Sequence, residues 1–178
     1  MELHEIRNET YIKAKNGIGF LLAAIVIWSI VTVIFLLPVD IQQKNIFMLI
    51  STGIMFPLSI GISVVIKADW QLKRNPLGNL GFIFNVAQLI YFPIIFFSMI
   101  SSPENVVLFF AIITGAHFFP YGWLYNAKPF YIMAPVIAVV LMILGIYLNG
   151  AHLWVIPFFL LICLLIADYK KKHAFVES

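Results

Sequence analysis

Long apolar runs separated by short polar stretches dominate this 178-residue chain. An α-helix of about 20 apolar residues crosses the ~30 Å hydrocarbon core of a bilayer, because each residue adds about 1.5 Å. The connections between the runs are too short to form a soluble domain. The pattern therefore predicts an all-α membrane protein, a single domain over residues 1–178 with six transmembrane helices in a compact bundle. The predicted spans, numbered one to six, are Gly17–Leu37, Ile46–Ile66, Leu80–Ile100, Val106–Leu124, Phe130–Tyr147 and Leu153–Ala167.

Composition leads to the same class of protein. Hydrophobic residues make up 62% of the chain and charged residues 11%, against about 45–50% and about 25% in soluble domains. This number of charged residues is too small to cover the surface of a soluble protein. Most side chains are therefore expected to face the lipid bilayer or other spans. The net charge of +3 is small, and no motif indicates a nucleic-acid partner.

The basic residues predict the orientation of the spans. With six spans, ten of the eleven lysines and arginines fall on one side of the membrane, and only Lys44 falls on the other. Because cytoplasmic segments are enriched in lysine and arginine, both termini are expected on the cytoplasmic side of a cell membrane. Leu3, Ile6 and Ile12 of the N-terminal tail can form a short helix on the membrane surface, although the tail carries charges of both signs. The ten basic residues are Arg7, Lys13, Lys15, Lys67, Lys73, Arg74, Lys128, Lys170, Lys171 and Lys172.

Strongly polar residues are rare inside the spans. Asn85 and Gln88 share a face of span three, and His117 and Tyr121 share a face of span four. Only five residues join these two spans, so they are expected to be antiparallel neighbours. Counted outward from this turn, Gln88 lies at the depth of His117, and Asn85 lies at the depth of Tyr121. We therefore predict a polar cluster of these four residues, which is a candidate substrate-binding site near the middle of the membrane.

Proline is the second unusual feature of the spans. Each of spans two to six contains one proline, which removes a backbone donor and tends to kink a helix. Pro120 leaves the carbonyl of Ala116 without its usual partner, directly beside His117. Kinked helices are typical of a cavity or a hinge, but proline is also common in membrane helices without such a role. The candidate kink residues are Pro57, Pro93, Pro120, Pro135 and Pro157.

Two interpretations of the polar cluster remain open. In one, the chain is a small permease or channel-like protein that binds a small molecule at His117. In the other, it is a non-transporting membrane component, such as a partner subunit, a lipid-interacting factor or an immunity or stress protein, and the cluster only fixes helix packing. A membrane-protein partner or a homo-oligomer is compatible with either interpretation.

Enzymatic chemistry is not expected from the sequence. The chain has no nucleophile-elbow motif, no zinc-protease motif and no phosphate-binding loop. Its single cysteine, Cys163, lies in an apolar run and is expected to be a small buried residue. The four histidines are too dispersed to share a metal ion, and no cofactor is expected. In its six-span topology and its preference for lysine and isoleucine, the chain resembles small uncharacterised integral membrane proteins of bacteria, a resemblance that implies no binding or catalytic residues.

Overall fold

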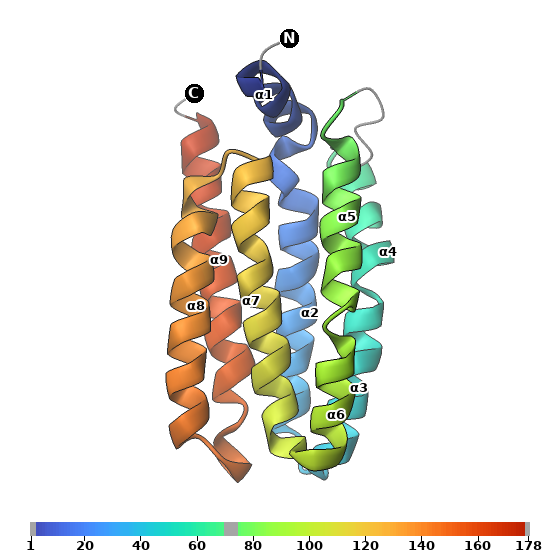
Figure 1. Ribbon diagram of the computed structural model, residues 1–178, viewed down its shortest axis with the longest axis vertical. Helices are drawn as coiled ribbons and strands as arrows, with labels where there is room; N and C mark the ends of the chain where they lie inside the picture. The colour runs from blue at the N-terminus through green and yellow to red at the C-terminus, as the bar shows by residue number, and fades with distance from the viewer. Residues whose placement is uncertain (1–2, 70–74, 177–178) are drawn as a thin grey trace.

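The computed structural model describes residues 3–69 and 75–176, and in this part of the chain the ordered elements are all helical. Six helical segments are long and apolar enough to span a membrane: Ile18–Leu36, Ile41–Val65, Gly78–Ser101, Pro103–Leu124, Lys128–Tyr147 and Gly150–Lys170. The number and order of the predicted spans are therefore confirmed. The α-helices, labelled in Figure 1, are α1 (Leu3–Lys13), α2 (Ile18–Leu36), α3 (Ile41–Gly53), α4 (Met55–Val65), α5 (Gly78–Leu89), α6 (Phe92–Ser101), α7 (Val106–Leu124), α8 (Lys128–Tyr147) and α9 (Val155–Val176).

Helix boundaries differ from the expected ones where polar residues extend a helix beyond its apolar run. Span two starts at Ile41, five residues earlier than expected, because Asp40 caps it by accepting a hydrogen bond from the backbone N–H of Gln43 at 3.0 Å. Lys44, in the first turns of α3, donates to the carbonyl of Phe35 at 3.0 Å. At the other end of the chain, α9 continues past the apolar run to Val176.

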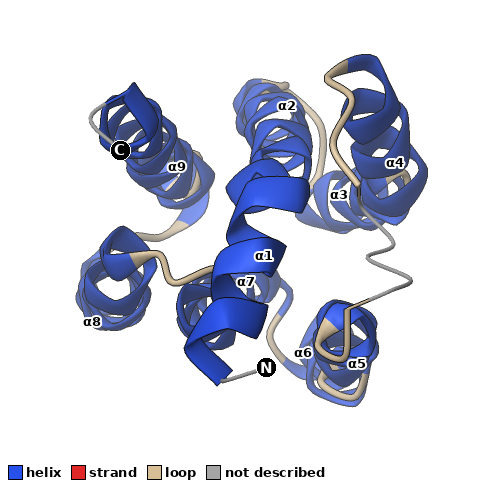
Figure 2. Ribbon diagram, turned by 90° about the horizontal axis from the view of Figure 1, so that it is seen from above, coloured by secondary structure: helices blue, strands red, loops and turns tan. Residues whose placement is uncertain are grey.

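The spans form two rows of three, seen from above in Figure 2. One row holds α9, α2 and the pair α3 and α4, and the other holds α8, α7 and the pair α5 and α6. Helix α2 is the most enclosed span, with 56% of its most apolar stretch buried, whereas only 6% of span three is buried. Span three therefore lies at the edge of the bundle, where it packs mainly against α7.

Close packing of α7 against α8 depends on a small residue. A Cβ added to Gly115 of α7 would overlap Cγ2 of Ile137 on α8. Because lipid tails are as apolar as leucine, membrane helices associate through such close contacts rather than through a hydrophobic driving force. Gly115 thus allows α8 to pack closely against α7, and this contact stabilises the part of α7 that carries His117.

Two of the prolines coincide with interruptions of their spans. Span two is interrupted after Gly53 and span three after Leu89. These are the residues whose carbonyls would bond to the positions that Pro57 and Pro93 occupy, four residues later. Proline has no N–H to give, so each helix loses a bond where it ends.

The other three prolines differ from one another in their setting. Pro120 and Pro135 lie inside helices that continue through them, α7 and α8. Pro157 lies within the sixth span, as expected, in the first turn of α9, which begins at Val155. A proline in the first turn interrupts no intrahelical bond, because the N–H groups there have no intrahelical partner.

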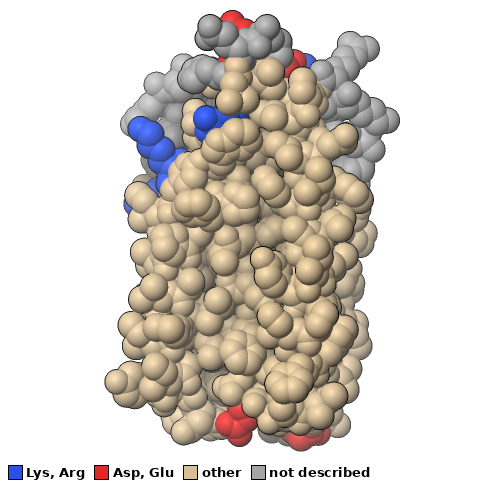
Figure 3. All heavy atoms as spheres, in the orientation of Figure 1, with Lys and Arg blue, Asp and Glu red and all other residues tan. Residues whose placement is uncertain are grey.

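Charge is distributed unevenly between the two ends of the bundle. Both termini lie at the same end (Figure 1), and lysine and arginine side chains gather there (Figure 3). The opposite end carries Asp40, Lys44 and Glu104. Lys73 and Arg74 lie outside the described residues. At this opposite end, the fully buried Asn45 donates to the carbonyl of Pro103 at 2.8 Å and so ties span two to the turn before α7.

The N-terminal tail forms the short helix that was expected, and α1 lies across the end of the bundle in Figure 2. Arg7 donates to the carbonyl of Trp123 and to Oδ1 of Asn126, both at 3.0 Å, and its guanidinium lies 5.1 Å from the centre of the Trp123 ring. On the other side, Asn75 donates to the carbonyl of Ile6 at 3.1 Å. Helix α1 is therefore attached both to the end of α7 and to the segment that precedes α5.

Candidate functional site

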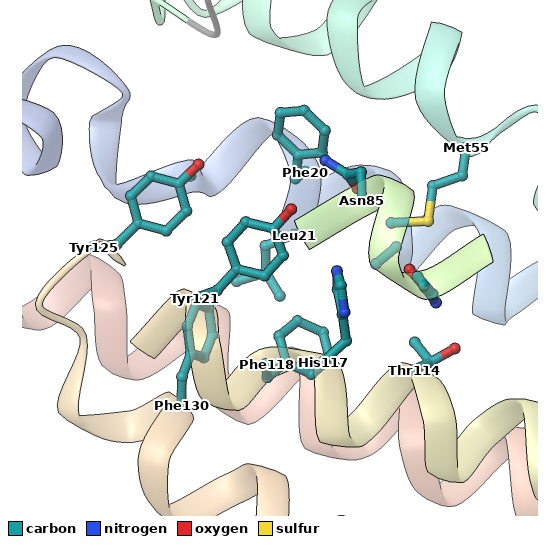
Figure 4. A pocket seen from close by; sticks show the side chains of 13 residues that line it. Phe20, Leu21, Met55, Asn85, Thr114, His117, Phe118, Tyr121, Tyr125 and Phe130 are labelled. Atoms are coloured by element: carbon teal, nitrogen blue, oxygen red, sulfur yellow. The ribbon is translucent and has the colours of Figure 1, made fainter. Parts of the chain in front are cut away.

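The four predicted site residues line one cavity. Asn85 and Gln88 of α5 and His117 and Tyr121 of α7 all contribute to the wall of a space of about 50 Å³. Figure 4 shows His117 and Tyr121 extending from α7 toward Asn85 on α5 and Leu21 on α2. The rest of the wall is mostly apolar and comes from Gly17, Phe20, Leu21, Ala24, Met55, Thr114, Phe118, Tyr125 and Phe130.

A single backbone carbonyl organises part of this wall. The hydroxyl of Tyr121 donates to the carbonyl of Gly81 at 3.1 Å, and the side-chain amide of Asn85 donates to the same oxygen at 2.9 Å. The first bond crosses from α7 to α5, and the second stays within α5. The ring of His117 lies edge-on to the ring of Tyr121, with 5.1 Å between the ring centres. The polar residues are thus gathered around Tyr121, which joins the two spans.

His117 stands apart from this hydrogen-bonded arrangement. Its Nε2 atom is buried, and no hydrogen-bond partner reaches it from the described residues. A buried polar atom without a partner costs about 1–3 kcal/mol. If the histidine served only to pack α7 against α5, a bond to the neighbouring helix would be expected. The arrangement instead leaves a buried imidazole nitrogen without a partner among the described residues, on a side chain that lines the smaller cavity.

A second and larger cavity adjoins the first. It has a volume of about 430 Å³ and shares part of its wall with the smaller one, namely Phe20, Met55, Asn85, Gln88 and Thr114. This volume falls within the ~300–1,000 Å³ of typical ligand pockets. The larger cavity lies among spans one to four, so the candidate site extends well beyond the boundary between spans three and four.

Both helix interruptions contribute to the larger cavity. Gly53 and Met55 line it from span two, on either side of the first interruption, and Leu89 and Phe92 line it from span three, on either side of the second. Interrupted membrane helices are a recurrent setting for substrate sites, because the irregular backbone faces a cavity rather than lipid. The two prolines therefore shape the larger cavity, which adjoins the smaller one that His117 lines.

The walls of both cavities carry no Asp, Glu, Lys or Arg among the described residues. Their polar groups are amides, hydroxyls, one imidazole and the indole of Trp28. No group of three or more His, Cys, Asp or Glu side chains that could hold a metal ion occurs in the part of the chain that the structure describes. What this lining can do chemically is exchange hydrogen bonds with an uncharged group while apolar side chains surround the remainder of a ligand.

Sequence patterns missed the residues that α2 and α4 contribute. Phe20, Leu21 and Met55 lie in unbroken apolar runs and carry no signal that separates them from lipid-facing neighbours. The glycine four residues before Pro57 could have indicated the interruption in span two. Tyr91, three residues after Gln88, is 49% exposed and lines neither cavity, because α5 ends before it.

Six apolar spans, an interior cavity and a charged end define a multi-pass membrane protein. The chain belongs to a family of unknown function, DUF7010, whose sequence pattern matches residues 3–169 and therefore all six spans. No curated protein and no solved structure matches the chain.

Proposed function

We propose that this protein is a small permease or channel-like protein, and that its substrate binds among spans one to four beside His117. The observation that carries the proposal is the buried, unpartnered Nε2 of His117, a residue that lines the smaller of two adjoining cavities. A ligand that bonds to this nitrogen removes the cost of leaving it unsatisfied. The surrounding apolar wall then contributes affinity through burial of the rest of the ligand.

The interruptions of spans two and three supply the movement that transport requires. Each is a point where the intrahelical bonding is already broken at a proline, so the two halves of the span can tilt relative to each other at low cost. Span three is suited to such movement because it is the least buried of the six spans. Movement of α5 relative to α7 would change the surroundings of the Asn85 and Tyr121 bonds to Gly81.

The proposed location is the cell membrane of a bacterium, with both termini in the cytoplasm. Support comes from the basic end of the bundle, since lysine and arginine are enriched in cytoplasmic segments. Reporter domains fused to the N-terminus and to the C-terminus test this orientation. Activity of a cytoplasm-dependent reporter at both ends is expected, and activity of a periplasm-dependent reporter at either end contradicts the proposal.

The functional test uses purified protein in lipid vesicles. A panel of uncharged small molecules is first screened for thermal stabilisation, because a ligand that binds the folded state raises the unfolding temperature. Molecules that stabilise the protein are then followed as they cross the vesicle membrane. His117→Ala is expected to weaken binding roughly 2- to 12-fold, the equivalent of one hydrogen bond, and to slow the flux. His152→Ala is the matched control, because His152 is exposed in the turn before α9.

Two results decide between the interpretations. Unchanged binding and flux in a correctly assembled His117→Ala variant contradict the proposed role of the imidazole. Binding that depends on His117 but is accompanied by no flux favours the alternative, a non-transporting membrane component that holds a lipid or another small molecule.

A further inference from the structure

We infer that the ligand is an uncharged, single-chain lipid-like molecule that reaches the cavity sideways from the bilayer, between spans two and three. This inference rests on the proposed function, because it names the class of substrate for the same site. It depends on four features of the structure: the side opening, the closed ends, the uncharged walls and the position of the polar groups.

The side opening lies where the larger cavity meets the outer surface of the bundle. Phe56 of span two and Phe82, Val86 and Leu89 of span three line the cavity. The same four residues are 42%, 62%, 42% and 59% exposed, respectively. Since this surface faces lipid in a six-span protein, the cavity communicates with the hydrocarbon of the bilayer. Span two packs mainly against α2, and span three packs mainly against α7, so neither span depends on the other for its main packing contacts.

Aromatic side chains close the cavity toward the end that lies opposite the termini. Trp28 and Phe110 are 1% and 5% exposed, and their ring centres are 6.0 Å apart. Phe92 lies edge-on against Phe110, at 6.2 Å between ring centres. This layer joins α2, α6 and α7 across the bundle. Water-soluble molecules from that side therefore meet packed rings rather than a channel.

The basic end is closed as well. The ring of Tyr125 stacks on that of Tyr121 with 5.7 Å between the centres, and Tyr125 is only 7% exposed. A Cβ on Gly17 would lie 2.9 Å from Cζ of Tyr125, so α2 and the end of α7 are in tight contact there. Helix α1 lies over this end of the bundle. The side opening is therefore the route that the structure leaves for a ligand.

The walls select against charge. A charged group placed among these side chains would lose its hydration, and no opposite charge lines either cavity in the described residues. An uncharged hydroxyl or carbonyl group, by contrast, can bond to Nε2 of His117 and to the side chain of Gln88. His117 and Tyr121 line only the small cavity, whereas Asn85, Gln88 and Thr114 line both, and most of the wall of the larger cavity is aliphatic or aromatic. The head of the ligand thus belongs beside His117 and its chain belongs in the larger space.

The volume of the larger cavity limits the ligand to a single hydrocarbon chain. The larger cavity, at about 430 Å³, lies toward the lower end of the ~300–1,000 Å³ of pockets that enclose small ligands. This suits a single hydrocarbon chain of moderate length and is too small for a whole two-chain phospholipid. The proposed ligand is thus an uncharged molecule of the kind represented by a long-chain alcohol.

Photolabelling in vesicles of phosphatidylcholine tests the inference. The probe is a long-chain alcohol with a diazirine group on its chain, and its counterpart has the same chain and a trimethylammonium head. Labelled residues are then identified by mass spectrometry. The alcohol is expected to label the cavity wall at Phe82, Val86 or Leu89 in preference to lipid-facing residues of α8 such as Val139 and Ile143, which are 53% and 46% exposed. The cationic probe is expected to show no such preference.

Two glycines of the same span provide a matched pair of variants. Gly53 lines the larger cavity and Gly61 does not, yet a Cβ on either would meet no atom within 4 Å. Gly53→Phe is expected to lower labelling of the cavity wall about tenfold, the effect of roughly 1.4 kcal/mol. Gly61→Phe is expected to label like the unchanged protein. Elution of both variants as single species in size-exclusion chromatography checks their assembly, and the site preference in the unchanged protein tests the inference independently of either variant.

The outcomes separate this inference from the proposed function. Equal labelling by both probes, labelling confined to outer faces, or unchanged labelling in Gly53→Phe overturns the inference. If a water-soluble molecule nevertheless binds and crosses in a manner that depends on His117, the proposed function stands with a different substrate. If the alcohol labels the cavity as expected but nothing crosses, the lipid-like ligand stands and transport fails.

Discussion

The contact between α7 and α8 allows a quantitative test of how the bundle is packed. Gly115 lies two residues before His117, and it faces Ile137, which is fully buried. A Cβ on Gly115 would overlap Cγ2 of Ile137 and would lie 3.0 Å from its Cβ, whereas carbon atoms in contact are ordinarily about 3.5–4.0 Å apart. Gly115→Ala must therefore push the helices apart or force Ile137 out of its rotamer.

The expected magnitudes follow from this geometry. Overpacking of a closed core costs about 1–3 kcal/mol, so Gly115→Ala should lower the free energy of unfolding by that amount. Ile137→Ala leaves a cavity and should cost about 2–5 kcal/mol. In the double variant, the new methyl group partly fills the space that the isoleucine vacates. The two costs should therefore fall short of additivity by about 0.5–3 kcal/mol.

The assay is reversible unfolding of the purified protein in mixed micelles of lipid and detergent. Gly61→Ala is the control, because a Cβ there meets no atom within 4 Å, and it should cause no loss, since alanine inside a helix is favoured over glycine by about 0.5–1 kcal/mol. If Gly115→Ala unfolds like Gly61→Ala, or if the costs of Gly115→Ala and Ile137→Ala add without coupling, then Gly115 and Ile137 do not pack against each other as described.

Three further predictions concern the ends of the bundle. Asn45→Ala should lower the free energy of unfolding by about 0.5–1.5 kcal/mol, because it removes the hydrogen bond that the side chain donates to the half-buried Pro103; the micelle assay measures this, and an unchanged free energy contradicts it. Arg7→Ala should weaken the attachment of α1 to the end of α7. In a background without other cysteines, a cysteine that replaces the fully buried Thr10 should then react faster with a maleimide. An unchanged rate of reaction contradicts this attachment. Lys13 bonds to Glu9 and lowers the pKa of that carboxyl below its ordinary 4.5. This stabilising contact is complete above pH 4.5 and is lost as the pH falls through the lowered pKa. The cysteine at position 10 should therefore react faster with a pyridyl disulfide only in that acid range. Its rate is measured relative to that of a cysteine that replaces the exposed Ile12.

Part of the candidate site was predictable because helix geometry is regular. A short turn between two membrane helices makes depth a matter of counting residues, so Gln88 and His117 could be placed at one level from the sequence. The structure brings both to the same cavity together with Asn85 and Tyr121. The bonding within the cluster was not predictable. Tyr121 and Asn85 bond to the carbonyl of Gly81, a backbone group whose availability depends on how α5 and α7 approach each other.

The role of the prolines could be predicted only in part. Their positions follow from the sequence, and so does the loss of one backbone bond at each. Pro57 and Pro93 accompany interruptions, whereas Pro120 lies inside a helix that continues through it. The difference depends on whether neighbouring helices hold the backbone in place. Helix α7 is packed against α8 along its length, whereas span three lies at the edge of the bundle.

The sequence by itself determined the class of this protein: six helical spans, their order and the separation of charge between the two ends. These properties depend on composition and on the fixed rise of a helix. Both are local to the sequence and do not depend on which helices pack against one another. Only the tertiary structure decided that two adjoining cavities form, the larger among spans one to four and the smaller also reaching Phe130 of α8, and that Nε2 of His117 has no partner among the described residues. In lipid every span is apolar on all sides, so the hydrophobic pattern does not mark which face of a helix turns inward, and that choice is left to the fit of side chains between helices.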